Sequence, residues 1–305
     1  MAFEQLIGND KIKDILKESV KKGNILHSYL FVGNEGIGKF HFAKEFTKMI
    51  LCFYKNGCNQ CKSCKEFDTE NHPDFLVVEP EGNTIKVEQI RQMISKIIEK
   101  PIISDKKVYI VNDSDKMTEE AQNTLLKTLE EPPENIIIIL IAEKEEKILS
   151  TIKSRCTKIT FQPIEQDKLK EILKKQYQYE NISEHLLTFF NGSIKKALNV
   201  KEKKEVYEQI EKMVLGIKQM NKIEMLNQKN NIDKEEIINI LEYMNLLFWE
   251  QSTQVDTKER ESAVKSILII EETKKRIQSN CNFDMTVDNM LMQLWEEWNE
   301  KNDRS

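Results

Sequence analysis

The chain has 305 residues, 39% of them hydrophobic, and a formal net charge of −5. This length exceeds one ordinary hydrophobic core, so we expect two or three domains. The acidic balance argues against a protein that grips nucleic acid alone through a broad basic surface. No cationic segment followed by an apolar segment opens the sequence, and the longest apolar run, Ile136 to Ala142, is too short to span a bilayer. We therefore predict a cytoplasmic protein.

Short apolar runs alternate with helical patterns in the first 163 residues. The runs that we expect to be strands are 28–32, 75–79, 107–111, 136–141 and 158–161. Their alternation with helices predicts a parallel sheet that is covered on both faces. The run 136–141 is apolar throughout, as expected of a strand buried on both faces, so we place it at the centre of the sheet.

A glycine-rich turn after the first strand carries most of a phosphate-binding motif. Gly33, Gly38 and Lys39 match the pattern of Gly, four residues, Gly and Lys, and Gly36 adds a further glycine. Backbone N–H groups of such a turn can surround phosphate oxygens at a helix N-terminus, while the lysine reaches the terminal phosphates. The pattern then requires Ser or Thr, but Phe40 offers no oxygen to a magnesium ion. The alternative is a turn that merely joins a strand to a helix.

Four of the six cysteines lie within thirteen residues, between the helix after this turn and the second strand. Cys52, Cys58, Cys61 and Cys64 have the spacing Cys-x5-Cys-x2-Cys-x2-Cys, and a two-residue spacer lets two thiolates meet one zinc ion at about 2.3 Å. Nothing nearby resembles a general base for zinc-dependent hydrolysis, so we predict a structural zinc ion. Two alternatives are His72 in place of Cys52, and redox-active thiols.

The third strand, 107–111, ends where an ATP hydrolase needs an acidic pair. Asn112 takes the position of the magnesium-side carboxylate, and Asp113 takes that of the base. An amide carries no charge, so Phe40 and Asn112 both remove ligands of the same ion. We therefore predict that hydrolysis has been lost. A shift of register that brings Asp113 or Asp115 into the metal shell is the alternative.

The sequence changes character at Pro163, because all six prolines lie at or before this residue. Long segments rich in Lys, Glu, Leu and Ile follow, and they predict a helical bundle: 168–176, 234–251 and 262–278. Near the end of the chain, four residues at helical spacing predict one apolar face, which we assign to a core in preference to a partner surface: Leu291, Leu294, Trp295 and Trp298.

Six stretches together resemble the AAA+ clamp-loader family of bacterial DNA polymerase III. They are 3–8, 27–33, the four cysteines, 72–74, 121–133 and 154–156. The resemblance covers the whole chain in order and is densest from 3 to 163. A zinc module between the loop and the second strand, combined with the Leu-Leu-Lys-Thr-Leu-Glu-Glu-Pro-Pro helix, is highly specific for this family.

The resemblance implies a three-part fold. An α/β P-loop (RecA-like AAA+) parallel-sheet domain spans 1–163 and contains the zinc module at 52–64, a small helical lid spans 164–203, and an all-α collar domain at 204–305 joins five subunits in a ring. The family's Ser-Arg-Cys arginine maps onto Arg155, which would reach in trans the ATP held by a neighbouring gamma or tau subunit. The implied partners are gamma/tau and delta clamp-loader subunits, the sliding clamp, and primed DNA through the assembled complex.

Four residues depart from the pattern of active clamp-loader ATPases: Phe40, Asn112, Ala142 at a polar sensor position, and Lys196 in place of a sensor arginine. These departures favour a non-catalytic subunit of the polymerase holoenzyme, and they leave open whether nucleotide binds at Lys39. One alternative is an active gamma- or tau-type clamp-loader ATPase. The other is a zinc-dependent nucleic-acid-binding module.

Overall fold

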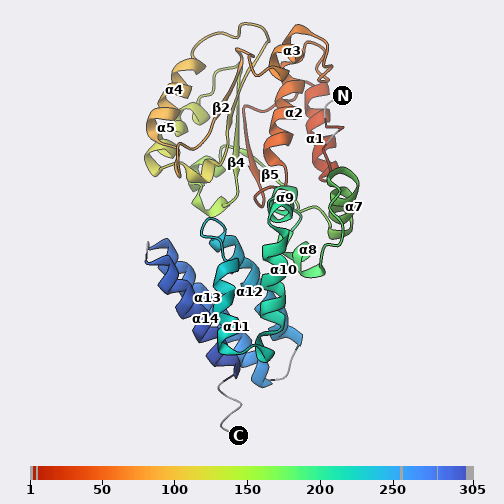
Figure 1. Cartoon of the computed structure of the whole chain (residues 1–305). Helices are drawn as coiled ribbons and strands as arrows, with labels where there is room; N and C mark the ends of the chain where they lie inside the picture. The colour runs from red at the N-terminus through yellow and green to blue at the C-terminus, as the bar shows by residue number, and fades with distance from the viewer. Residues whose placement is uncertain (1–2, 5, 255–256, 280, 300–305) are drawn as a thin grey trace. The chain divides into compact units, whose positions relative to one another are not determined.

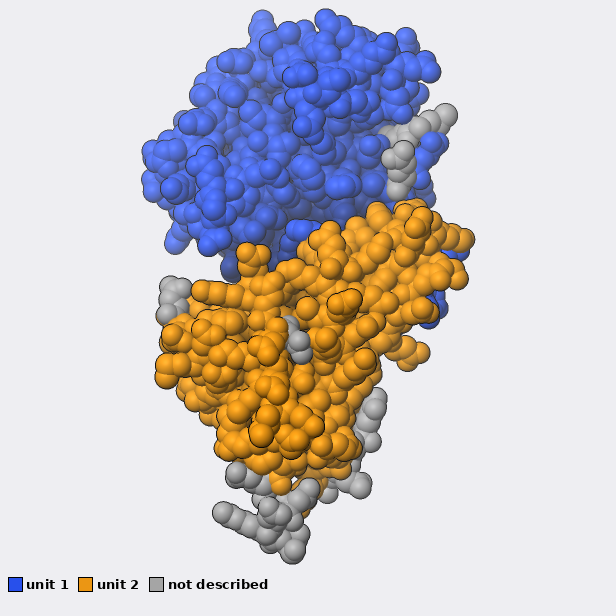
Figure 2. All heavy atoms as spheres, viewed as in Figure 1, with its two compact units in different colours: residues 1–172, 191–195 blue, residues 173–190, 196–305 orange. Residues whose placement is uncertain are grey.

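The computed structural model describes residues 3–4, 6–254, 257–279 and 281–299. Gln5 of the first family stretch and residues 255–256, 280 and 300–305 of the expected collar lie outside the described residues. The chain divides into two compact units, which Figure 2 colours separately: Met1–Ile172 with Asn191–Lys195, and Leu173–Phe190 with Lys196–Ser305. The three-part division into domain, lid and collar stays a prediction.

The first unit is built on a five-stranded parallel sheet (Figure 1). Its strands lie in the order β2 (Phe75–Val78), β3 (Lys107–Val111), β4 (Ile136–Ala142), β1 (Ser28–Val32) and β5 (Thr157–Thr160). The predicted parallel-sheet α/β fold and the central place of the 136–141 run are therefore confirmed. The ends differ slightly from the prediction, since β2 stops one residue earlier and β5 lies one residue earlier than 158–161. Element ends are the part of a fold that a sequence pattern specifies least.

Helices cover both faces of this sheet, as Figure 1 shows. One face is covered by α1 (Asp10–Lys21), α2 (Lys39–Leu51) and α3 (Lys62–Asp68), and the other by α4 (Val87–Ile97), α5 (Glu119–Glu130) and α6 (Ser150–Lys153). Alternate residues of β4 enter the two cores: Ile137, Ile139 and Ile141 pack on the α2 side, and Ile136, Ile138, Leu140 and Ala142 on the α5 side. Burial on both faces explains why every position of this strand is apolar.

Capping and proline set the limits of α5. The Thr118 hydroxyl accepts a hydrogen bond from the backbone N–H of Ala121 at 3.2 Å, which satisfies one of the free donors at the helix start. Pro132 and Pro133 follow the last helical residue, Glu130, and cannot continue the hydrogen-bonding pattern. Short 3-10 turns lie at Ser114–Lys116, Glu145–Lys147, Ile217–Gln219 and Gln228–Asn231.

All elements after β5 are helical, as predicted. They are α7 (Gln166–Tyr177), α8 (Glu184–Phe190), α9 (Ile194–Glu202), α10 (Lys204–Leu215), α11 (Lys222–Asn227), α12 (Ile237–Gln254), α13 (Thr257–Gln278) and α14 (Phe283–Asn299). The stripe on α14 belongs to the core of the second unit, because Leu291, Leu294 and Trp298 are buried. Trp295 is half-buried, and its Nε1 donates to the carbonyl oxygen of Met220 at 2.8 Å. Within the described residues, no helix is long and apolar enough to cross a membrane.

Candidate functional site

The glycine-rich turn lies between β1 and α2 and is tightly packed. A Cβ added to Gly33 would lie 2.8 Å from the carbonyl oxygen of Phe161. Gly36 has a φ of +74°, and a Cβ there would lie 2.1 Å from Oγ of Ser193 and 2.9 Å from Cβ of Lys195. The segment Asn191–Lys195, which belongs to the same unit, therefore covers the turn at Gly36.

Lys39 begins α2, but its side chain turns back onto its own loop. Nζ donates to the carbonyl oxygen of Gly33 at 2.5 Å and to that of Asn34 at 2.7 Å. Burial lowers the pKa of the Lys39 ammonium, and nearby carboxylates oppose this shift: Glu143, Asp113, Asp115 and Glu35. A phosphate would have to compete with two carbonyl oxygens for the ammonium, and it would meet these negative charges. The loop has most of the sequence of a phosphate-binding loop, but the Lys39 ammonium is hydrogen-bonded to the loop's own carbonyl oxygens.

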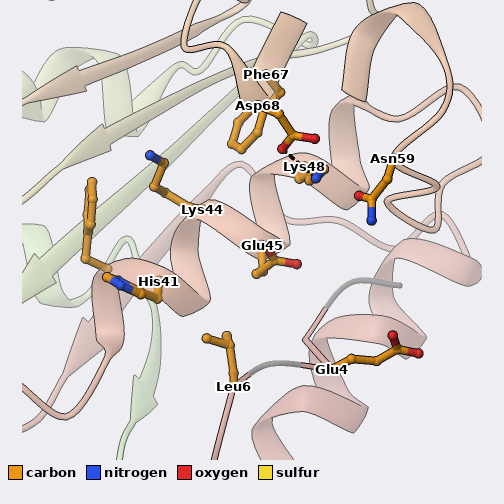
Figure 3. A pocket seen from close by; sticks show the side chains of 10 residues that line it. Glu4, Leu6, His41, Lys44, Glu45, Lys48, Asn59, Phe67 and Asp68 are labelled. Atoms are coloured by element: carbon orange, nitrogen blue, oxygen red, sulfur yellow. Dashed lines mark hydrogen bonds and ion pairs between the residues drawn. The ribbon is translucent and has the colours of Figure 1, made fainter. Parts of the chain in front are cut away.

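Phe40 packs where the motif would place a hydroxyl. Its half-buried ring contacts the core beneath α2, and Nζ of Lys44 lies 5.7 Å from the ring centroid. Phe40 also lines a pocket of about 520 Å³ between α2, α3 and the segment before α1. Figure 3 shows that His41, Lys44 and Glu45 from α2 face this pocket, where Lys48 pairs with Asp68 at 2.6 Å. The glycines of the turn do not line this pocket.

The polar groups after β3 each have a protein partner. Asn112 donates from Nδ2 to Oε1 of Glu79 at 3.2 Å, and Asp113 pairs with Lys116 at 2.8 Å. Asp115 is buried, and its Oδ1 accepts the backbone N–H of Glu143 at 3.1 Å. Asn112 therefore has only an uncharged amide oxygen to offer a magnesium ion, and each of the two carboxylates already has a partner on one oxygen.

The two positions predicted from the resemblance to be sensor positions carry no polar sensor side chain and no arginine, respectively. Ala142 is buried at the end of β4 and has no polar side-chain atom. Lys196 belongs to the second unit, where its Nζ lies 3.6 Å from the ring centroid of Phe189 and 3.8 Å from Oε2 of Glu242. Its charge is therefore balanced within the helical unit.

The four predicted zinc ligands lie together. The Sγ atoms of Cys52, Cys58, Cys61 and Cys64 all lie within 4.8 Å of one another, and the separations Cys52–Cys61 and Cys58–Cys64 are both 4.0 Å. Four sulfurs at about 2.3 Å from a tetrahedral ion would be about 3.8 Å apart. The cluster therefore has the donor set and nearly the dimensions of a closed four-thiolate site, and it could hold a metal ion such as zinc.

Backbone N–H groups point at these sulfurs in sequence. Cys58 N–H donates to Cys52 Sγ at 3.5 Å, Cys61 N–H to Cys58 Sγ at 3.3 Å, and Cys64 N–H to Cys61 Sγ at 3.4 Å. Burial by itself raises the pKa of the Cys52 thiol, but backbone donors outweigh burial and bring this pKa to about 6. Burial raises the pKa of the Cys64 thiol. The N–H donors stabilise the thiolate form that metal binding requires.

His72 lies outside the sulfur cluster, so the alternative in which it replaces Cys52 is wrong. Its Nε2 lies 3.0 Å from Oγ of Ser63, and its Nδ1 accepts the backbone N–H of Asp74 at 3.1 Å. The buried carboxylate of Asp74 in turn accepts three N–H groups at 2.7 to 2.8 Å, those of Ile102, Ile103 and Ser104. The His72-Pro-Asp74 signal therefore marks an anchor that joins the module to the loop before β3.

Arg155 lies two residues after the last residue of α6, with its side chain 34% exposed. Nη1 donates to the carbonyl oxygen of Thr151 at 2.8 Å, and Nη2 lies 2.7 Å from Oε1 of Glu130. No sequence pattern predicted that Glu130 would contact Arg155. The available signal was a glutamate at the C-terminal end of α5, where the helix dipole disfavours a negative charge.

Comparisons with known proteins match this chain to subunits of DNA polymerase III. A family model described as DNA polymerase III, delta subunit, matches residues 8–165. The chain is 28% identical over 320 residues to DNA polymerase III subunit delta' of Bacillus subtilis, covering 94% of this chain and 96% of that protein. It is 35% identical over 135 residues to subunit delta' of Pseudomonas aeruginosa, covering 43% of this chain and 41% of that protein.

Similarity to tau- and gamma-type proteins is also present. The chain is 35% identical over 165 residues to DNA polymerase III subunit tau of Bacillus subtilis, but this match covers 53% of this chain and 29% of that protein. The crystal structure of a DNA polymerase III gamma subunit-related protein from Thermotoga maritima has a similar fold, with a TM-score of 0.51 and 20% identity over 93% of this chain and 99% of that chain.

Proposed function

This chain belongs to the delta-prime family of DNA polymerase III clamp-loader subunits, and we propose that it acts there without hydrolysing ATP. In this role it helps to load the sliding clamp onto primed DNA and supplies Arg155 to the ATP of a neighbouring subunit. The observation that carries the proposal is the contrast between the two sites: Lys39 is buried against its own loop, whereas Arg155 keeps part of its side chain exposed although it too has protein partners.

The chemistry of the nucleotide loop supports a subunit that does not hydrolyse ATP. Phosphoryl transfer depends on a magnesium ion to neutralise developing charge. Phe40 has no oxygen to offer that ion, and Asn112 offers only an uncharged amide oxygen in place of a carboxylate. Both substitutions remove ligands of the same magnesium ion, so the loss of ATP hydrolysis explains them together.

A subunit that does not hydrolyse ATP can still be required for ATP hydrolysis by its neighbour if it supplies an arginine across their interface. A guanidinium supplied in trans stabilises the charge of the transferring phosphoryl group, and such a residue contributes on the order of 10³ to 10⁵ in rate. Arg155 meets the steric requirement, since part of its side chain is accessible. The proposed partner that holds the ATP is a gamma or tau subunit, a type of protein to which this chain is similar. The other proposed partners are a delta subunit, the sliding clamp and primed DNA.

We assign the four-cysteine cluster to a structural zinc ion. Cys52, Cys58, Cys61 and Cys64 would supply all four ligands, which leaves no position for a reacting water. Zinc held in this way contributes folding free energy to the module between α2 and β2. The chain's own N–H donors keep the sulfurs oriented toward one another.

The test is ATP turnover by a loader reconstituted from this chain, a gamma or tau subunit and a delta subunit. We expect this chain alone to be inert, and we expect Arg155→Ala to slow the assembled ATPase while size-exclusion chromatography still shows the complete assembly. Lys158→Ala removes a neighbouring exposed cation, which pairs with Glu145, and is the matched control.

Three results would overturn the proposal. Hydrolysis by the isolated chain that is lost in Lys39→Ala would identify an active gamma- or tau-type ATPase. Unchanged turnover of the Arg155→Ala assembly would remove the role in trans. Strong salt-dependent affinity of the isolated chain for DNA or RNA would favour the nucleic-acid-binding alternative.

A further inference from the structure

We propose that Glu130 is a positioning residue for Arg155, so that the guanidinium is already oriented when a neighbouring subunit presents its ATP. This inference rests on the proposed function of Arg155 in trans. Glu130 is the last residue of α5, and its Oε1 lies 2.7 Å from Nη2 of Arg155.

The backbone of Arg155 is fixed on two sides. Its N–H donates to the carbonyl oxygen of Ile152 at 3.0 Å, which continues the turn of α6. Its carbonyl oxygen accepts the hydroxyl of Ser28, the first residue of β1, at 2.6 Å. The Cα of the arginine is therefore held at the edge of the sheet, and the remaining freedom is in its side chain.

Three contacts restrain that side chain. Nη1 donates to the carbonyl oxygen of Thr151 at 2.8 Å and to Oγ of Ser154 at 3.3 Å, and both acceptors belong to the local turn. Glu130 provides the third contact and comes from a different helix. Among these contacts, only that with Glu130 joins the guanidinium to an element outside the α6 segment. Glu130 therefore sets the direction in which the guanidinium points relative to the sheet.

Local helix energetics do not explain a glutamate at position 130. The C-terminal end of a helix carries a partial negative charge, which disfavours a carboxylate, and Glu131 adds a second negative charge at the same end. Lys127 is the basic residue of the last turn, and Arg155 brings a second positive charge, in direct contact with Glu130. The pair thus relieves an unfavourable arrangement in α5 while it orients the arginine.

Orientation before reaction is the way in which such a contact can raise a rate. A donor that is already aimed at the developing charge needs no reorganisation in the transition state. An arginine side chain has many rotamers, and fixing it in advance reduces the entropy lost at that moment. The pair is partly exposed, so its contribution is modest: we expect removal of the carboxylate to lower kcat by about 2- to 5-fold.

The experiment measures kcat and KM for ATP of the full reconstituted loader. Glu130→Ala should lower kcat with KM unchanged, and Glu130→Gln should keep more activity because its amide oxygen still accepts from Nη2. Glu131→Ala is the matched control, because the exposed Glu131 neighbours Glu130, and it should leave both constants unchanged. In an Arg155→Ala background, Glu130→Ala should have no further effect.

The outcomes separate this inference from the proposed function. If Arg155→Ala leaves turnover unchanged, the proposed function fails and the inference fails with it. If Arg155→Ala slows turnover but Glu130→Ala does not, only the inference fails. A rise in turnover on removing Glu130 would mean that the carboxylate masks the arginine, and an equal loss with and without Arg155 would mean a purely structural role; either result overturns the inference.

Discussion

Nζ of Lys39 lies 2.5 Å from the carbonyl oxygen of Gly33, the first glycine of the same loop. In a working phosphate loop, this ammonium would reach the terminal phosphates of the nucleotide. Here a phosphate must break this contact and the one to Asn34, in a region where several carboxylates lie near the lysine. The loop therefore keeps its shape through the same cation that ligand binding would require.

We expect the isolated chain to show no ATP-dependent rise in melting temperature at millimolar ATP with magnesium. A ligand raises stability appreciably only when its concentration is comparable with its dissociation constant or higher, so a nucleotide that does not bind leaves the melting temperature unchanged. Lys39→Met should give the same absence of response, and a gamma or tau subunit is the positive control. A saturable shift that Lys39→Met removes would contradict this reading of the loop.

We expect Cys58→Ser to lower the zinc content of the purified chain and to reduce its melting temperature. Three thiolates with one hydroxyl bind zinc less tightly than four thiolates, and structural zinc contributes folding free energy. The measurement is metal analysis by mass spectrometry together with thermal unfolding, before and after chelation. Cys281→Ser is the control, because that exposed thiol lies outside the cluster. Equal zinc content in the two variants would count against a four-cysteine site.

We expect Gly36→Ala to destabilise the chain more than Gly82→Ala. Both glycines have similar positive φ values, +74° and +70°, so both variants incur a backbone cost of about 1–2 kcal/mol. The added Cβ at position 36 also collides with Ser193, whereas nothing lies within 4 Å at position 82. The collision should add about 1–3 kcal/mol to the loss of unfolding free energy. Urea denaturation measures both variants, and equal losses would mean that the 191–195 segment does not cover the loop.

We expect His72 to make the chain less stable as the pH falls. Burial lowers the pKa of His72, so the unfolded chain takes up the proton at a higher pH than the folded chain. Folding stability should therefore decrease as the pH falls below about 6.5 toward the pKa of the folded state. His72→Asn has no group that titrates here, while its side-chain oxygen can accept the N–H of Asp74.

The comparison is urea unfolding of the wild-type chain and His72→Asn at a series of pH values from about 7.5 to about 5. The wild-type chain should lose more stability than the variant over this range, because other titrating groups are shared. Parallel pH profiles would show that the imidazole is not held in its neutral form.

Patterns within short segments were enough to predict much of this protein. The unbroken apolar run of β4 required burial on both faces, which places a strand inside a covered parallel sheet. The spacing of the four cysteines was enough to predict that their sulfurs lie together, because all four belong to one short segment that ends in the first turn of α3. Residue identity at Phe40 and Asn112 was enough to predict the loss of magnesium ligands, because it alone decides whether a side chain has a hydroxyl or a carboxylate.

Tertiary structure decided the contacts between segments far apart in the chain. Nothing local predicts that Gly36 meets Ser193, or that Glu130 meets Arg155. Lys196, predicted to replace a sensor arginine, lies against Phe189 and Glu242 in the helical unit. Such pairs depend on which surfaces the packed cores bring together, and long charged side chains can reach several partners from one backbone position. Sequence spacing therefore determined local features such as the cysteine cluster. The partner of each charged side chain depended on how the helices and strands pack.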